Sequence, residues 1–595
     1  MANTTTDNMD ELLFYKIASN GKAIDSTFRL SSLQTNQTVN RIGKATLCFD
    51  SGNIDDYSFP ESDSDTFKPG AEISISIGYT AGKEETIFEG IVISQSLRIE
   101  TDIRPQLIVE CRDYTYPATQ GRKNAVFEKK SDSTVISTIL KKYGLSASGS
   151  STSFEHEKLI QYYCTDWDFI RSRAEACVLV ICTVGKKVTI KQPEVSAAPV
   201  LTLKYGKDMF SFNGTLSASE QFTKTEAVTW DIHKQSLSSV QSATPRLNQQ
   251  GNMAISDLSK INSDNSLCQS DAGIPKEAMK IWADAQALRS GLSRYQGDFT
   301  FAGNASVTAG CIISLDNTGK RFNGYVYAGG VEHSLKDGLW ITRVIMGLPS
   351  DNVTDLPDVP APPVSGSLPG ISGLHIGKVK QIADDPQKEF RILVEIPILN
   401  GKPNEIWARL STLYASNGLG SYFLPEKNDE VIIGFFNNDP NYPVILGSMF
   451  SSKQAMPYTP DEKNEIKAIV SREKLKIEFD EKKKIICLTT PNKNKIEIND
   501  DGKYISLKDQ NKNEIVMEAG GITLNSCKDL TLKAKGNILV DAGMELNEKA
   551  KTNVTTEGMN VKITAKMGVT VKGSATAELS ASGQTTVKGG IVMIN

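Results

Sequence analysis

The chain has 595 residues, more than one hydrophobic core organises, so we expect several domains. A net charge of −4 disfavours a nucleic-acid-binding surface. No run approaches the roughly eighteen apolar residues of a membrane helix, the first residues do not resemble a signal peptide, and the nine cysteines include no CxxC pair, which favours a reducing cytoplasm.

Alternating apolar residues predict a β-rich block at the start of the chain. Residues 28–50 have the composition of strands, and a turn at Pro69-Gly70 leads into the alternating segments 72–79 and 86–93. We therefore expect a small β-barrel over about the first 125 residues.

The hydrophobic period then changes from that of strands to that of helices. Apolar residues spaced three and four apart predict one helix between Asp132 and Gly144 and a second from Asp166 through Ala176. These helices indicate an α/β segment inserted at about 130–200.

A further helix and a second barrel follow the inserted segment. Pro275 is expected at the first helical position of a helix that runs to about Arg294. The strand-like segments 322–327, 330–333 and 338–344 predict that a second barrel completes a tandem-barrel domain over residues 1–365.

A proline-, serine- and glycine-rich linker at 355–369 precedes a compact β module at 366–455. Five short strands in roughly eighty residues suit an OB-type barrel. Nucleic-acid binding by this module is disfavoured, because most of its aromatic residues lie in strands and its acidic residues offset the basic ones.

The end of the chain repeats in eights. From Leu530, two apolar positions separated by one residue and then a small residue recur every eight residues, with one seven-residue step. This pattern predicts one short strand and one tight turn per unit. Such strands cannot bury their apolar face alone, so we expect three intertwined chains over 471–595, after a linker at 456–470; a single-chain β-solenoid is the alternative. The predicted spike core is Leu530, Leu532, Ile538, Val540, Leu546, Val554, Val561, Ile563, Val569, Val571, Leu579 and Val587.

Several local motifs precede this repeat in a fixed order. They are Pro69-Gly70 followed by 88–92, then 166–170, 322–325, and the segment from Asp439-Pro440 through 442–447. In this order the parts resemble VgrG, the trimeric tip-protein family of bacterial type VI secretion systems. The resemblance implies a mainly β protein with tandem hub β-barrels, an inserted α/β segment, an OB-fold barrel and a C-terminal trimeric triple-stranded β-helix (a β-prism). Cys177 departs from the family, which usually has glycine there.

The resemblance also implies a function. The protein is expected to be a structural spike that caps the tube of a contractile injection machine, punctures the target envelope and carries effectors; the alternative is the spike of an extracellular injection particle or phage tail. The implied partners are two further copies of the chain, a hexameric tube protein at the N-terminal hub, baseplate wedge proteins, a PAAR-type cap and separate effector proteins. We expect the protein to be cytoplasmic before firing and then delivered without a signal peptide. The residues expected to dock the cap are Ile591, Val592, Met593, Ile594 and Asn595.

The sequence offers no enzymatic motif. Its four histidines are not at ligand spacing from one another, and there is no HExxH, nucleophile elbow or P-loop. We interpret His333 as structural, and Cys177 and Cys182 as lacking further metal ligands, so no catalytic residue, metal or cofactor is predicted. A spike with cell-wall hydrolase activity is disfavoured, because only about twenty residues separate the OB module from the needle, where phage relatives can carry a lysozyme. A trimeric adhesin would need an export signal or a receptor-binding head, and neither is visible.

Overall fold

The computed structural model describes residues 12–53, 55, 57–101, 103–262, 265–399 and 403–594. It consists of two compact units, Met1–Met449 and Phe450–Asn595, which are described separately. The fold is mainly β, as the sequence predicted, and in the described residues no helix is both long and apolar enough to cross a membrane. The α-helices are α1 (Pro60–Asp63), α2 (Asp132–Lys141), α3 (Asp166–Ala176), α4 (Ile255–Leu258) and α5 (Lys276–Leu292).

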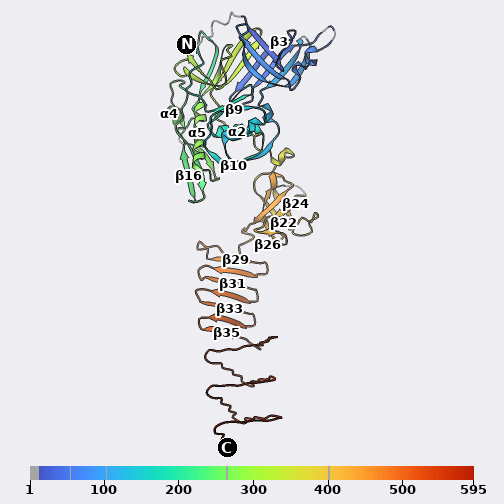
Figure 1. The fold of residues 1–595 in the computed structure, drawn as a ribbon, viewed down its shortest axis with the longest axis vertical. Coiled ribbons are helices and arrows are strands. Elements are labelled where there is room, and N and C mark those ends of the chain that lie inside the picture. The colour runs from blue at the N-terminus through green and yellow to red at the C-terminus, as the bar shows by residue number, and fades with distance from the viewer. Residues whose placement is uncertain are drawn as a thin grey trace. The chain divides into compact units, whose positions relative to one another are not determined.

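A continuous 13-stranded sheet is the framework of the first unit (Figure 1). Its main path is β14-β18-β21-β20-β3-β4-β7-β6-β5-β1-β2, and β13 and β19 branch from β20. The strands are β1 (Phe14–Ser19), β2 (Lys22–Ala23), β3 (Arg29–Thr38), β4 (Lys44–Asp50), β5 (Glu72–Gly78), β6 (Glu85–Glu100), β7 (Ile103–Arg112), β13 (Leu201–Lys204), β14 (Met209–Leu216), β18 (Tyr295–Ala302), β19 (Ile312–Asp316), β20 (Gly324–Lys336) and β21 (Leu339–Met346).

The two predicted barrel regions share this sheet but have separate cores. The first core contains Phe49, Phe67 and Leu107, and the second contains Phe299 and Phe301. Strand β20 joins the two regions, because it pairs with β21 on one side and with β3 on the other. The hub is therefore one sheet with two packed halves.

The inserted α/β segment confirms both predicted helices. Helix α2 buries Val135, Ile136, Ile139 and Leu140. The Thr165 hydroxyl caps α3 by accepting a hydrogen bond from the Asp168 N–H at 3.0 Å. The helices pack with β8 (Lys123–Ser131), β9 (Ser146–Gly149), β10 (Glu155–Cys164), β11 (Val180–Val184) and β12 (Lys187–Lys191).

The glycine that the family places after α3 is not required at Cys177. Cys177 ends the helix at φ −112°, and Val178, the next residue, takes the left-handed conformation at φ 64°. The left-handed position is therefore Val178, the residue after the one at which the family usually has glycine.

Helix α5 begins one residue later than predicted. Pro275 is the N-cap rather than the first helical residue, and the helix ends at Leu292. It packs through Met279 and Ala283 on the small sheet β16-β15-β17, which consists of β15 (Thr225–Asp231), β16 (Ser236–Gln241) and β17 (Ser266–Ser270).

The OB prediction is confirmed by a closed five-stranded barrel, β22-β23-β24-β28-β27. Val379, Val394, Ala408, Ile433 and Ile445 form its core. The strands are β22 (His375–Gln381), β23 (Ile392–Glu395), β24 (Glu405–Leu410), β27 (Glu430–Phe435) and β28 (Pro443–Ser448), with the hairpin β25 (Ala415–Ser416) and β26 (Leu419–Gly420) between β24 and β27.

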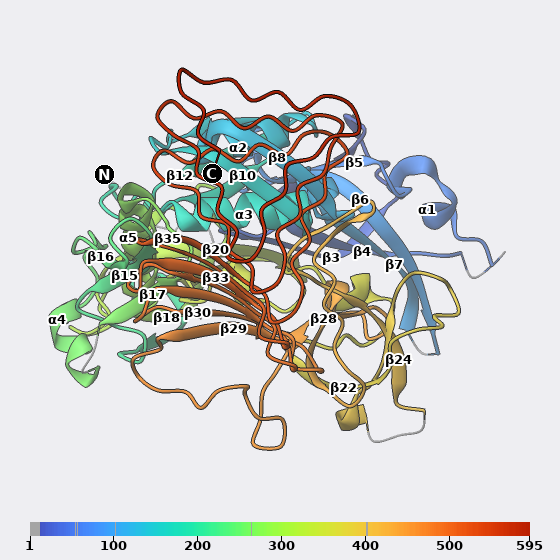
Figure 2. The ribbon, with the colours of Figure 1, turned by 90° about the horizontal axis from the view of Figure 1, so that it is seen from below.

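The second unit begins with a seven-stranded antiparallel meander, in which every strand pairs with the next along the chain. Seen along the stack in Figure 2, these strands lie over one another with a progressive rotation, the usual twist of a sheet. They are β29 (Ile466–Val470), β30 (Lys476–Asp480), β31 (Ile485–Thr489), β32 (Lys495–Asn499), β33 (Tyr504–Lys508), β34 (Glu514–Glu518) and β35 (Gly521–Asn525).

Candidate assembly surface

The meander carries a two-residue-wide apolar ribbon along one face. Side chains on alternate residues of a strand point to the same face, and the register places apolar residues opposite one another in two columns. One column is Ile469, Ile477, Leu488, Ile496, Leu507, Ile515 and Leu524, and the other is Phe479, Ile486, Ile498, Ile505, Met517 and Ile522.

The single chain leaves this ribbon open to water. Ile477 is 39% exposed and Leu488 41%, and the two ribbon residues on β35, Ile522 and Leu524, are more exposed still. An antiparallel sheet in a soluble protein normally covers its apolar face, and contiguous apolar surface of this kind marks an interaction site. The ribbon is therefore a candidate interaction surface.

The opposite face is polar and internally satisfied. Glu497, only 4% exposed, receives hydrogen bonds from Lys495 and Tyr504. Burial raises the pKa of Glu497, but these two contacts outweigh it, so the net pKa lies below the ordinary value. Glu478 repeats the arrangement with Lys476, whose Nζ lies 2.8 Å away, and with the Tyr458 hydroxyl. This face already has its partners, so the apolar face is the one left to be covered.

The octad repeat appears in the backbone as regularly spaced bends. They occur at 527–528, 535–536, 543–544, 551–552, 559, 566–567, 574–575, 582–583 and 590–591, so the single seven-residue step is present as well. Between the bends the chain is extended, and over 526–594, a stretch that is described throughout, the single chain forms no β-ladder. Because extended backbone needs hydrogen-bond partners, the backbone of these segments is open to pairing with added strands.

The predicted spike-core residues are all exposed in the single chain. Figure 1 shows the bent, extended backbone to which they belong. Val571, for example, is 83% exposed in the single chain. Ile591, Val592, Met593 and Ile594, predicted to dock the cap, are also exposed, whereas Asn595 lies outside the described residues. The apolar ribbon from Ile469 to Leu524 and the octad residues together form what we call the open apolar face.

The Asn-, Asp-, Gly- and Lys-rich segments between the meander strands, 492–494, 500–502 and 510–513 among them, form turns, as their composition predicted, but the composition did not indicate which residue takes the left-handed conformation. Lys474, Lys493 and Lys512 recur at a spacing of nineteen residues and take left-handed φ values of 62°, 67° and 73°. Each is held by a short turn, as where the Lys493 N–H donates to the Thr490 carbonyl at 2.9 Å. Asn and Asp are the residues usually expected at left-handed turn positions, but in the turns of Lys493 and Lys512 they supply side-chain hydrogen bonds instead. The nineteen-residue spacing of the lysines was the sequence signal that could have identified these left-handed positions.

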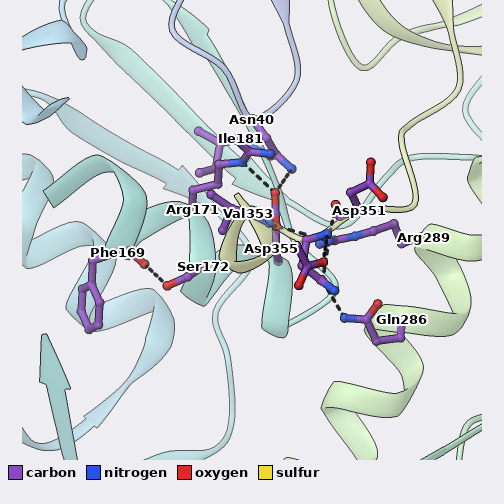
Figure 3. Close-up of polar contacts among 12 residues, drawn as sticks. Asn40, Phe169, Arg171, Ser172, Ile181, Gln286, Arg289, Asp351, Val353 and Asp355 are labelled. Carbon is purple, nitrogen blue, oxygen red and sulfur yellow. Dashed lines mark hydrogen bonds and ion pairs between the residues drawn. The ribbon is translucent and has the colours of Figure 1, made fainter. Parts of the chain in front are cut away.

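A buried carboxylate in the first unit was also missed. Glu175 accepts hydrogen bonds from the Arg171 Nε (2.8 Å), the Asn40 Nδ2 (3.3 Å) and the Val353 N–H (2.8 Å), and the Arg289 guanidinium lies 3.2 Å away. These four partners are labelled in Figure 3. Burial lowers the pKa of Arg289 despite this pairing. The cluster joins the sheet, α3, α5 and the start of the linker.

Beyond this cluster, Arg122 holds the linker by hydrogen bonds to its backbone. The Arg122 guanidinium donates to the carbonyls of Val359 (3.3 Å) and Pro360 (3.0 Å), as well as to that of Asp358. Val364 is buried. The proline-rich segment is therefore held against folded structure rather than behaving as a free tether.

His333 and Cys177, which were considered as candidate catalytic or metal-binding residues, both contact neighbouring side chains. His333 is buried and bonded through Nδ1 to the Thr342 hydroxyl at 3.0 Å. His156 and Cys177 both contact one oxygen of Asp132, at 2.9 and 3.1 Å. Burial, and then Asp132, raise the pKa of the Cys177 thiol, which disfavours a reactive thiolate. Among the described residues, no group of three or more His, Cys, Asp or Glu is placed to hold a metal ion.

Two segments of the chain match known protein families, and a shorter stretch is similar to a known spike protein. Residues 9–337 match the family model of the Alg8 N-terminal domain, and residues 375–450 match the type VI secretion system/phage-baseplate injector OB domain. A 52-residue stretch is 36% identical to the type VI secretion system spike protein VgrG1a of Pseudomonas aeruginosa. That stretch covers 9% of this chain and only 8% of the relative.

Two solved structures are similar at low sequence identity. The 43 kDa tail protein of prophage MuSo2 from Shewanella oneidensis has a TM-score of 0.44 at 11% identity, over 57% of this chain and 99% of that chain. The E. coli c3393 protein, a type VI secretion component similar to the T4 tail proteins gp27 and gp5, has a TM-score of 0.37 at 12% identity, over 73% of this chain and 100% of that chain.

Proposed function

The chain belongs to the family of the Alg8 N-terminal domain, and from this premise we propose that it is the homotrimeric spike of a contractile injection machine. The injector OB domain and the VgrG relatives support a spike protein of the phage-tail and type VI kind. The observation that carries the proposal is the open apolar face, which runs from Ile469 to Val587.

Three chains satisfy the requirements of this face. Each five-residue strand spans about 17 Å, so three such strands can close a triangle around a narrow core with their charged faces outward. Each fully buried apolar side chain stabilises the assembly by about 1.5–3 kcal/mol. In the octad region, strands of the neighbouring chains would supply the missing backbone partners.

Substitution at one octad tests the trimer. Val571→Asp would place three carboxylates in the dry core, and we expect the heat-resistant trimer to be lost, because a buried unpaired charge is strongly unfavourable. Thr570→Asp is the matched control, since Thr570 is adjacent and points to the opposite face. Light scattering of full-length protein measures the outcome; a monomeric parent protein, or a Val571→Asp variant that remains an intact trimer, would contradict the proposal.

The hub is the proposed seat for the hexameric tube protein. Each chain contributes one sheet with two packed halves, so three chains would present six related positions to a six-fold ring. We expect a fragment covering residues 1–365 to associate with tube protein and a fragment covering 470–595 not to do so, as measured by co-purification. The wedge proteins of the baseplate would surround the same hub.

The exposed C-terminal segment is the proposed dock of a PAAR-type cap. Three copies of Ile591, Val592, Met593 and Ile594 would form a small apolar end. The double variant Ile591→Ser and Met593→Ser should lose co-purification with the cap while remaining trimeric. Retention of the cap by this variant would argue against this dock.

The mechanism we propose is mechanical rather than enzymatic. Contraction of an outer sheath would drive the spike through a target envelope, together with separate effector proteins. The protein would be cytoplasmic before firing and would leave the cell through the machine itself. Hydrolysis of peptidoglycan by the purified protein would overturn the non-enzymatic assignment, and sheath-independent appearance outside the cell would overturn the delivery route.

A further inference from the structure

The turns of the meander place opposite charges on its two flanks, the sides of the sheet where the strands end. Because every strand pairs with the next along the chain, successive turns alternate between these flanks (Figure 1). One flank carries a lysine in each of three successive turns, and we call this set the lysine column: Lys474, Lys493 and Lys512. The other flank carries a carboxylate at the same nineteen-residue spacing, and we call this set the carboxylate column: Glu462, Glu481 and Asp500.

Hydrogen bonds hold the turns of each flank in line. On the lysine flank the Gln510 N–H donates to the Asn494 Oδ1 at 2.9 Å. On the carboxylate flank the Glu481 N–H donates to the Glu465 carbonyl at 2.8 Å. Both columns therefore run along the stack on a fixed backbone, and neighbouring members of a column lie two strands, or about 10 Å, apart.

The side chains of both columns are available to a partner. All six are exposed, and none of them forms a side-chain hydrogen bond or ion pair with another described residue. Other charges on the carboxylate flank are paired within the chain, as Lys484 is with Asp501 at 2.9 Å and Lys483 with Asp480 at 3.3 Å.

The charges that remain after such pairing differ in sign between the flanks. Turns 461–465, 481–484 and 500–503 keep five carboxylates and three lysines. The turns of the lysine flank, 471–474, 490–493 and 509–512, keep three lysines and one carboxylate once the pair of Arg472 and Glu473 is set aside. The two flanks are therefore complementary.

The lysine column also occupies an unusual backbone conformation. Its three members have φ values of 62°, 67° and 73°, in the left-handed region that is strained for a residue with a side chain. Glycine or asparagine would fit these turns more easily. The turn itself does not explain a lysine at the same position three times, which indicates that its charge is used.

We propose that the lysine column of one copy meets the carboxylate column of the next copy and forms a ladder of alternating charges along each corner of the spike. The inference rests on the proposed trimer and names a charged contact outside its apolar core. In a closed three-fold ring each copy turns one flank to one neighbour and the opposite flank to the other neighbour. Unlike flanks therefore meet at every corner.

Three-fold symmetry also fixes the heights of the two columns, because it places equivalent strands of the three copies at the same level. The lysine turns follow β29, β31 and β33, whereas the carboxylate turns precede β29 and follow β30 and β32. Each lysine turn is thus offset by one strand spacing, about 4.8 Å, from the nearest carboxylate turns, which a flexible lysine side chain can span. The order along a corner alternates in charge: Glu462, Lys474, Glu481, Lys493, Asp500 and Lys512.

Such a ladder acts on the choice of neighbour more than on total affinity. One exposed ion pair contributes little, but a network of several pairs contributes more. Complementary charges favour the contact of unlike flanks and penalise the contact of like flanks. The ladder would therefore favour three parallel copies over an arrangement in which one copy is inverted.

Zero-length crosslinking of the unmodified full-length protein tests the contact directly. A carbodiimide joins a lysine amine to a carboxylate, with loss of water, where the two groups touch. The columns lie at opposite ends of five-residue strands about 17 Å long, so an amide between Lys493 and Glu481 or Asp500 joins two chains. We expect these amides in the mass spectrum of the digested trimer. A trimer in which the lysine column forms no such amide would overturn the ladder.

Charge reversal provides the second measurement. The triple variant Lys474→Glu, Lys493→Glu and Lys512→Glu should lower the midpoint temperature of trimer dissociation by roughly 5–10 °C, because nine attractive lysines per trimer become repulsive. About 1 M salt should remove most of this difference. Further reversal of the carboxylate column, by Glu462→Lys, Glu481→Lys and Asp500→Lys, should restore the midpoint.

The matched control reverses three lysines of the other flank. Lys463→Glu, Lys482→Glu and Lys503→Glu make the same change in net charge but add carboxylates opposite the lysine column, so the midpoint should not fall. Equal falls for both triple variants, or a fall that neither salt nor the reversed carboxylate column corrects, would overturn the ladder. If light scattering still shows a trimeric parent protein, the spike proposal stands; a monomeric parent protein would overturn both.

Discussion

Glu175 shows how one side chain connects distant parts of the first unit. Its carboxylate receives hydrogen bonds from Asn40 in the turn between β3 and β4, from Arg171 on α3 and from Val353 before the linker, and it forms an ion pair with Arg289 on α5. A cluster in this position ties the hub to the segment that leads toward the OB barrel. In a machine that transmits force along its axis, such a tie would resist separation of the linker from the hub.

Neutralising this carboxylate should destabilise the hub. Glu175→Gln keeps an acceptor for Val353 but removes the carboxylate that pairs with the largely buried cations of Arg171 and Arg289, and we expect a loss of about 3–5 kcal/mol in the free energy of unfolding. Glu128→Gln, which breaks an exposed pair with Lys158, should cost at most about 1 kcal/mol. Denaturant unfolding of the hub measures the free energy of unfolding of both variants. Equally small losses would show that Glu175 does not stabilise the contact between the hub and the segment before the linker.

His333 should make the hub sensitive to acid. Burial lowers the pKa of His333 from 6.5 to about 4, so the unfolded chain binds a proton more readily than the folded one. The stability held by the neutral ring is present above pH 6.5 and is lost as the pH falls toward 4, by up to about 3 kcal/mol. His333→Gln, which keeps a polar partner for Thr342, should flatten the dependence of the melting temperature on pH in this window. An unchanged dependence would place the acid sensitivity elsewhere.

At the scale of elements, the helices and strands that could be predicted from the sequence are those with a regular spacing of apolar residues. Helix α3 and the OB strands were found because their apolar spacing matches one element type. The Glu175 cluster was not, because its members lie far apart in the chain and none has a local pattern. Nor was the continuity of the hub sheet, which depends on the pairing of β20 with β3 across most of the hub.

The octad repeat contains a charged residue at a predicted core position, and this can be tested directly. Glu548 is in phase with the apolar residues Leu532 and Val540 of the two preceding units and with Thr556 of the next. In a closed prism Glu548→Leu would remove three inward carboxylates and bury three side chains, so we expect a gain of about 1.5–3 kcal/mol per chain. Asn547→Leu is the control on the opposite face and should give no such gain.

The midpoint temperature of trimer dissociation measures this difference. A lower midpoint for Glu548→Leu, with no change for Asn547→Leu, would mean that Glu548 makes a favourable contact and that the octad phase is misassigned. Because the variants differ by one position, a general effect of added apolar surface would raise both equally.

At the scale of the whole molecule, the two units bury their apolar residues in different ways. The described cores of the first unit close within one chain. The second unit leaves its apolar face open along its length, so in the proposed trimer its stability would depend on the concentration and integrity of the assembly. The same chain thus combines parts whose described cores close within one chain with a part that the proposed assembly would complete.

Heating followed by trypsin should separate these two behaviours. We expect the first unit to unfold and be digested, while a trimeric fragment beginning between residue 450 and β29 survives, because cleavage requires local unfolding. Lys474, Lys493 and Lys512 are potential trypsin sites, but their left-handed turns are hydrogen-bonded between paired strands. Cleavage at these lysines in the parent protein would show that the meander is not protected by neighbouring chains. The Val571→Asp variant is the internal control, since a protein whose trimer is lost should release peptides from these same lysines.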